Sequence, residues 1–116
     1  MDFYPVGQPP LNPTMPKPKP LSQEELQVLR GLAPEWQIDA LGLGMRRVFL
    51  FKDFGQAFAF MTQVATLIHQ QDHHPHWSNV YAKVEVFLST HEVDALTLRD
   101  QALALEMDKI WDSLIP

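Results

Sequence analysis

Residues 53–89 read DFGQAFAFMTQVATLIHQQDHHPHWSNVYAKVEVFLS, and the spacing of their apolar residues changes from a helical period to a strand period. Asp53, with Gln56 three residues later, forms an N-terminal helix cap. The 3.6-residue period then predicts a helix whose buried face is formed by Phe54, Ala57, Phe58, Met61, Val64, Ala65 and Ile68. Farther along, every second residue from Val80 to Leu88 is apolar, which predicts a strand with one face against a core.

Helix caps on both sides of this stretch extend the predicted fold. Ser22 with Glu25 begins a first helix, and Thr97 with Asp100 begins a last one. The intervening segment 36–51 is predicted to form a hairpin, because two glycines precede a run of β-favouring residues. The order helix, hairpin, helix, strand, helix predicts an α+β fold, with an antiparallel sheet of about four strands covered on one face by three helices.

The first twenty residues differ from the rest because they hold most of the ten prolines of the chain. Proline fixes φ and lacks an amide donor, so this run favours extended backbone over helix or sheet. The sequence therefore predicts a disordered, proline-rich tail at 1–20 and one globular domain at 21–116. The alternative for the tail is a ligand for a proline-recognition module.

Composition excludes several classes of function. A net charge of −5 and a pI near 5.4 argue against direct nucleic-acid binding, because phosphates are bound by clustered Lys and Arg. The chain has no cysteine, so any metal or catalytic role falls to His, Asp and Glu. No apolar run approaches the roughly 18 residues of a membrane span, and the N-terminus lacks a secretory signal. We expect a cytoplasmic protein with no membrane partner.

Histidine is concentrated where the helix after Asp53 must end, since the residue before Pro75 avoids the helical region. Three interpretations are open: a polar helix end, a zinc site, or a metal-free acid/base site. In the zinc site, His69 and His73 on one helix face would be joined by His91 or Asp72. The acid/base site rests on the ability of imidazole to exchange protons near neutral pH. The clustered residues are His69, His73, His74 and His76, with His91 after the predicted strand.

A specific set of residues surrounds this cluster. The run Asp72-His73-His74-Pro75-His76-Trp77-Ser78-Asn79-Val80-Tyr81 is followed by Lys83-Val84-Glu85-Val86 and Leu88-Ser89-Thr90-His91-Glu92. Further matching residues are Phe51-Lys52-Asp53-Phe54, Ala57-Phe58, Phe60-Met61, Val64-Ala65, Trp36, Leu96 and Arg99-Asp100. Together they closely resemble the pterin-4a-carbinolamine dehydratases, from Ser22 to the last helix.

The resemblance implies a lyase that dehydrates 4a-hydroxytetrahydropterin (4a-hydroxytetrahydrobiopterin) to quinonoid dihydropterin, in recycling of the pterin cofactor of aromatic amino acid hydroxylases. It implies no cofactor and no metal. His73 is expected to be the principal acid/base group, His91 to assist at the leaving hydroxyl, and His74 to bind and orient the substrate. The substrate-binding residues that it implies are Trp36, His73, His74, Pro75, Thr90, His91 and Glu92. For Trp36, packing in the core is an alternative.

Three residues qualify the resemblance. Asp100 matches a recurring family position, but its place in the first turn of a helix explains it without chemistry. His69 stands where the family often has an acidic residue, and His76 is an additional histidine. Both make adventitious metal binding more plausible than in other relatives.

The resemblance also carries an alternative function and an expected assembly. Some relatives are dimerisation partners of a homeodomain transcription factor, and degenerate relatives are assembly factors for other proteins. Retention of His73, His74 and His91 favours the enzyme. Family members form dimers and tetramers, so a homodimer or homotetramer is expected, through an exposed strand edge or helix face.

Overall fold

The computed structural model describes residues 17–115. The sequence predictions for residues 1–16 lie outside this range. The elements are α1 (Gln23–Leu32), β1 (Gln37–Ile38), β2 (Met45–Leu50), α2 (Phe54–Gln71), β3 (His76–Val80), β4 (Lys83–Leu88), the short 3₁₀ helix η1 (His91–Val93) and α3 (Leu98–Leu114). None of the described helices is long and apolar enough to cross a membrane.

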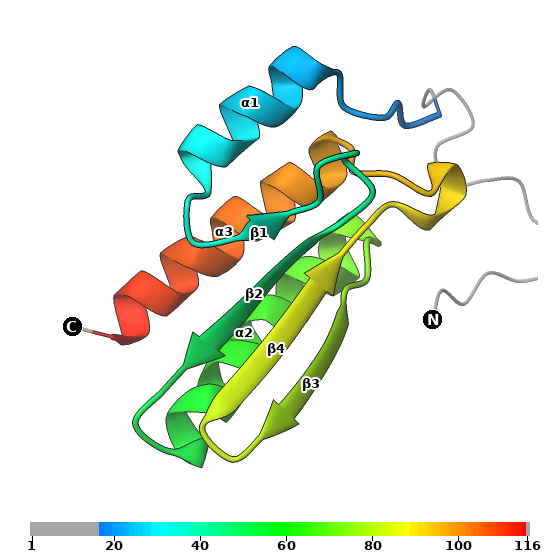
Figure 1. Cartoon of the computed structure of the whole chain (residues 1–116). Helices are drawn as coiled ribbons and strands as arrows, with labels where there is room; N and C mark the ends of the chain where they lie inside the picture. The colour runs from blue at the N-terminus through cyan, green and yellow to red at the C-terminus, as the bar shows by residue number, and fades with distance from the viewer. Residues whose placement is uncertain (1–16, 116) are drawn as a thin grey trace, which may run out of the picture.

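The strands form one antiparallel sheet in the order β1-β2-β4-β3. Helices α2 and α3 lie behind this sheet, and α1 lies beside β1 and α3, so one face of the sheet is left open (Figure 1). All three helices and the covered face of the sheet contribute to a single core, which includes Leu29, Phe49, Phe60, Val86 and Leu103. The predicted α+β fold, with a four-stranded antiparallel sheet and three helices, is confirmed.

The predicted strand from Val80 to Leu88 was wrong in its extent. The chain turns at Tyr81 and Ala82, and β3 and β4 pair as a hairpin in which Val80 lies opposite Lys83. Tyr81 has φ 51°, and the Asn79 side chain donates hydrogen bonds to the carbonyl oxygens of Tyr81 and Lys83, each at 3.0 Å. The apolar Val80 and Ala82 extended the predicted alternation across the turn, but a two-residue turn shifts the in-out pattern by one residue: Val80 is exposed, whereas Val84 is buried.

The caps predicted for the three helices are present. Ser22 and Glu25 form a reciprocal capping box on α1, Thr97 and Asp100 form one on α3, and the Asp53 side chain accepts a hydrogen bond from the Gln56 amide at 2.8 Å.

The buried face of α2 differs from the predicted stripe. It consists of Ala57, Phe60, Val64 and Ile68, whereas Phe54 and Phe58 are exposed and stack on each other with ring centroids 5.6 Å apart. Helix α2 is therefore apolar on two sides, and a single helical period could not identify the side that faces the core.

One backbone position joins three distant parts of the chain. The Leu96 amide donates to the carbonyl of Gly42 at 2.8 Å, and the Leu96 carbonyl accepts from the Leu21 amide at 2.9 Å. Gly42 has φ 73°, a left-handed conformation that glycine adopts without strain. The start of α1, the β1–β2 loop and the segment before α3 are thereby held together beside the N-terminus of α3.

Candidate active site

The histidine pair lies where α2 gives way to β3. Helix α2 ends at Gln71, and its C-cap Asp72 adopts a left-handed conformation with φ 52°. This reversal directs two successive side chains to different surroundings. His73 is buried, with 7% of its surface exposed, and His74 remains accessible. The prediction that both residues lie just beyond the helix end is confirmed.

His73 is in contact with the first turn of α3. Its Nε2 lies 2.6 Å from Oδ1 of Asp100, whose side chain is completely buried. The other carboxylate oxygen, Oδ2, accepts hydrogen bonds from the Thr90 hydroxyl at 2.7 Å and from the Thr97 amide at 2.9 Å. A buried carboxylate is stable only when its oxygens are hydrogen-bonded, and here both oxygens have partners.

Thr90 connects this contact to the end of β4. Its hydroxyl lies 2.6 Å from the Thr97 hydroxyl, and its backbone forms an isolated antiparallel bridge with Ala95. The bridge closes the loop that contains His91 and Glu92. We call His73, Thr90, Thr97 and Asp100 the buried polar network; these four are the buried polar or charged residues of the described chain.

His91 begins η1, directly after Thr90, and its side chain is fully exposed. Its Nδ1 lies 4.0 Å from Oδ1 of Asp94. Glu92 forms an ion pair with Arg99 at 2.8 Å. The structure thus places His91 one residue from the network, with its imidazole in solvent.

The other predicted site residues lie outside the network. His74 Nε2 lies 3.5 Å from Oδ1 of Asp72, and Pro75 is half-buried before β3. Trp36 lies in the core, where its Nε1 donates to Asp108 at 2.8 Å and its ring meets Phe49 edge-on at 5.9 Å. Asp108 is two turns along α3 from Asp100, or about 12 Å at 1.5 Å per residue.

The histidines are not arranged around a common point. His69 is exposed on α2, whereas His73 is buried against Asp100. Between residues 17 and 115, no three His, Asp or Glu side chains form a group that could hold a metal ion.

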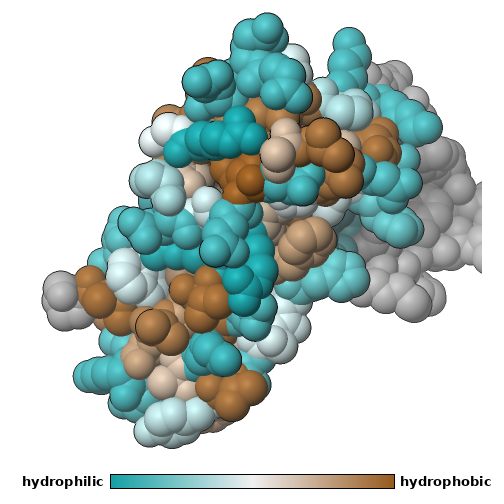
Figure 2. Space-filling view, in the orientation of Figure 1, coloured by the Kyte–Doolittle hydropathy of each residue, from teal (hydrophilic) through white to brown (hydrophobic). Residues whose placement is uncertain are grey.

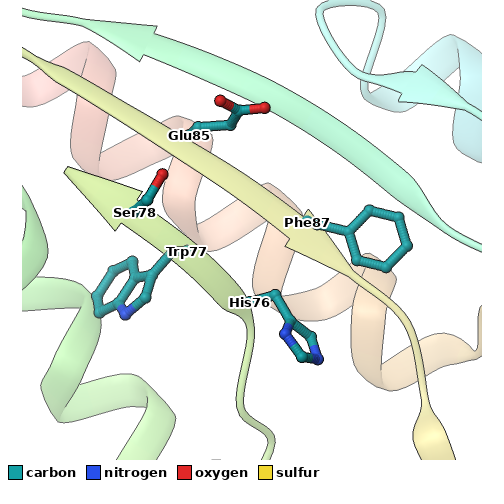
Figure 3. Close-up of a pocket in the computed structure, with 5 residues that line it drawn as sticks. All are labelled: His76, Trp77, Ser78, Glu85 and Phe87. Atoms are coloured by element: carbon teal, nitrogen blue, oxygen red, sulfur yellow. The ribbon is translucent and has the colours of Figure 1, made fainter. Parts of the chain in front are cut away.

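The open face of the sheet has a separate hollow close to the histidines. It is lined by His76, Trp77, Ser78, Glu85 and Phe87, and the rings of His76 and Phe87 meet edge-on at 6.4 Å (Figure 3). Glu85 is bound there by Arg46 of β2 at 2.6 Å. On this side of the molecule, apolar side chains form separate groups with hydrophilic residues between them (Figure 2).

Comparison with known proteins identifies the family of this chain. The family model described as pterin 4 alpha carbinolamine dehydratase matches residues 19–110. The chain belongs to this family. The dehydratase family consists of hydro-lyases, and that is the enzyme class of the chain.

Similar family members are found in several bacteria. A relative from Prochlorococcus marinus (strain MIT 9215), named for the same dehydratase, is 45% identical over 83% of this chain and 98% of its own length. One from Novosphingobium aromaticivorans, with the same name, is 44% identical over 76% and 92%. A solved structure from Brucella melitensis, described as a transcriptional coactivator/pterin dehydratase, has a TM-score of 0.75 and 36% identity over 79% of this chain and 98% of that one.

Within the dehydratase family fold, two residues of the network were not assigned to a site from the sequence. Asp100 was interpreted as a helix cap, and it is one, but it also contacts His73 across 27 positions of sequence. Thr97 was identified only as the cap of α3. No local pattern indicates a contact over such a separation. The available signal was the recurrence of Asp100 as a family position.

Proposed function

We propose that this chain dehydrates a 4a-hydroxytetrahydropterin to quinonoid dihydropterin by histidine acid/base catalysis, in the recycling of a pterin cofactor. The observation that carries the proposal is the buried contact between His73 and Asp100, at residues that match the dehydratase family. The relatives' names supply the substrate class. A cytoplasmic location stays a prediction from the sequence.

The reaction requires two proton transfers and no redox step. The 4a C–O bond breaks with its electrons on oxygen, and the hydroxyl takes a proton to leave as water. A ring N–H loses its proton, and that electron pair forms the new C=N bond. Imidazoles suit both transfers because they exchange protons near neutral pH.

The three histidines are suited to different parts of this reaction. His73 is held by a buried carboxylate, so we assign to it the principal acid/base role. His91 is fully exposed on η1, where it is free to protonate the leaving hydroxyl of a bound substrate. His74 is accessible beside Pro75, and we assign it to binding and orienting the ring. Thr90 and Glu92, which flank His91, would contact the pterin, and Trp36 would support the site from the core.

The test is an assay in which a pterin-dependent aromatic amino acid hydroxylase supplies the carbinolamine. We expect the wild-type chain to accelerate dehydration and His73→Ala to lower kcat by about 10² to 10⁴-fold, the usual contribution of a general acid/base. His69→Ala, which alters an exposed histidine one turn earlier, is the matched control and should retain the wild-type rate. Full activity in His73→Ala would refute the assignment of His73.

A second candidate function is a non-catalytic dimerisation or assembly factor on the same fold. It is favoured by the description of the Brucella melitensis structure as a coactivator as well as a dehydratase. The same assay separates the two functions, because a protein that only binds would give no rate enhancement.

We also propose that the chain forms a homodimer or homotetramer. Two exposed features support this: β3 is an edge strand of the sheet, and Phe54 and Phe58 form an exposed apolar pair on α2. Unpaired strand edges and apolar patches are common sites of self-association. Light scattering would give the mass, and a monomer at micromolar concentration would contradict the proposal.

A further inference from the structure

The hydrogen atoms of the buried polar network can be assigned by elimination. A backbone amide can only donate, so Asp100 Oδ2 must accept from the Thr97 amide. The same oxygen accepts from the Thr90 hydroxyl, which therefore receives its own hydrogen bond from Thr97. A carboxylate only accepts hydrogen bonds, and the carboxylate form of Asp100 is the premise of this assignment. At Oδ1, the donor must then be Nε2 of His73, at 2.6 Å.

From this order of hydrogens we infer that Asp100 is a positioning residue, which holds neutral His73 in the tautomer with hydrogen on Nε2 and a bare Nδ1. The inference rests on the proposed function for its catalytic meaning, but the tautomer itself is a property of the free protein. Thr90 and Thr97 contribute because both donate to Oδ2 of Asp100, which leaves Oδ1 as the acceptor for His73.

The bare nitrogen is also the one that a ligand can reach. The hydrogen bond of His73 within residues 17–115 is made through Nε2. In this part of the chain, no fully buried side-chain nitrogen or oxygen lacks a hydrogen-bond partner. Nδ1 must therefore lie in the 7% of His73 that remains exposed.

This tautomer determines the direction in which His73 first acts. A bare Nδ1 accepts a proton, so neutral His73 begins the reaction as the base that removes the ring N–H proton. The resulting imidazolium donates from Nε2 to Asp100, a charge-assisted hydrogen bond that stabilises it. The proton for the leaving hydroxyl must then come from another group, and exposed His91 is suited to that step.

Asp100→Asn tests the assignment because the network fixes the orientation of the new amide. The Thr97 amide cannot reverse its hydrogen, so the asparagine oxygen must take the position of Oδ2. Its NH₂ group then faces His73, whose Nε2 has to accept. We expect this substitution to move the hydrogen of His73 from Nε2 to Nδ1.

The experiment is ¹⁵N NMR of histidine-labelled protein at a pH where the rings are neutral, with the His73 signals identified by their loss in His73→Gln. In the wild type we expect Nε2–H and bare Nδ1; in Asp100→Asn, the reverse. Asp112→Asn, which removes an exposed carboxylate from the same helix, should leave the wild-type pattern. Nδ1–H in the wild type would overturn the inference, even if Asp100→Asn failed to fold.

Kinetics provide an independent second measurement. Asp100→Asn should lower kcat by about 10³ to 10⁴-fold with little change in KM, as expected when a positioned base is held in the wrong tautomer. If the tautomer is as expected but the wild type has no dehydratase activity, the proposed function fails and the positioning role of Asp100 stands. If the tautomer reverses without loss of kcat, His73 does not act through Nδ1 and the inference is overturned.

Discussion

Tyr81 has a left-handed backbone conformation, with φ 51°. The residue is 66% exposed. An L-residue other than glycine, asparagine or aspartate is strained there, by roughly 1–2 kcal/mol. The two hydrogen bonds from the Asn79 side chain hold the turn in place. The strain of the β3–β4 turn is thus located at one residue whose side chain contributes little packing.

Two substitutions at Tyr81 should separate backbone strain from side-chain loss. Both Tyr81→Asn and Tyr81→Val remove the exposed ring, but asparagine tolerates the left-handed region and valine does not. We expect the free energy of unfolding of Tyr81→Val to be lower than that of Tyr81→Asn by about 1 kcal/mol. Urea unfolding of the two variants measures this, and equal stabilities would show that the turn is not strained.

At the scale of single residues, the sequence indicates candidate residues but not the contacts between them. His73 and His74 were visible as site candidates from their types and their family match, and Asp100 only as a helix cap at a recurring family position. The hydrogen bond between His73 and Asp100 was not visible, because it depends on how α2, β4 and α3 meet in space. An aspartate that caps a helix and one that also contacts a buried histidine have the same local sequence signature.

Arg47 of β2 is a charged residue on the covered face of the sheet, where β2 packs against α3. Arg47 lies between the rings of Phe49 and Trp111, at 4.3 and 5.0 Å, and binds Asp108 of α3 at 2.7 Å. Burial raises the pKa of Asp108 above its usual 3.8, and the Trp36 hydrogen bond and the Arg47 charge only partly oppose this. The folded protein therefore binds a proton at Asp108 more tightly than the unfolded chain does.

This raised pKa predicts a pH-dependent difference between wild type and Asp108→Asn. The stabilising contribution of protonated Asp108 is complete below pH 3.8 and is lost as the pH rises through the higher folded pKa. The free energy of unfolding of wild type minus that of the variant should accordingly fall from acid to neutral pH.

Urea unfolding at successive pH values measures this difference. Asp94→Asn, which removes an exposed carboxylate, serves as the control. A difference that rises with pH would mean that the ion pair with Arg47 outweighs burial.

At the scale of elements, helices were easier to predict than strands. Caps marked the N-termini of α1, α2 and α3 because their side chains bond within the same turn. The strand β3 was missed because its inward residues, Trp77 and Asn79, do not form an apolar run. The segment forms a strand because it pairs with β4. A pattern within the segment does not show this pairing.

The division of the whole chain into a tail and a domain at residue 21 stays a prediction, and truncation can test it. Leu21 donates to Leu96, and Ser22 caps α1. A chain that starts at Lys17 should be as stable as the full chain. One that starts at Gln23 should lose the cap, about 0.5–2 kcal/mol, in addition to the Leu21 contact.

Denaturant unfolding compares the three chains. Lower stability of the chain that starts at Lys17 would show that the residues before it contribute to the domain.

The shared use of Asp100 by α3 and by His73 has an evolutionary consequence. A descendant that gave up dehydration for a binding role would lose one hydrogen bond of Asp100 by changing His73, whereas losing Asp100 would leave both the buried amide of Thr97 and the hydroxyl of Thr90 without this acceptor. The aspartate should therefore outlast the histidine in lineages that have lost the reaction. In this family, an aspartate without its histidine would mark a former enzyme more reliably than the absence of both.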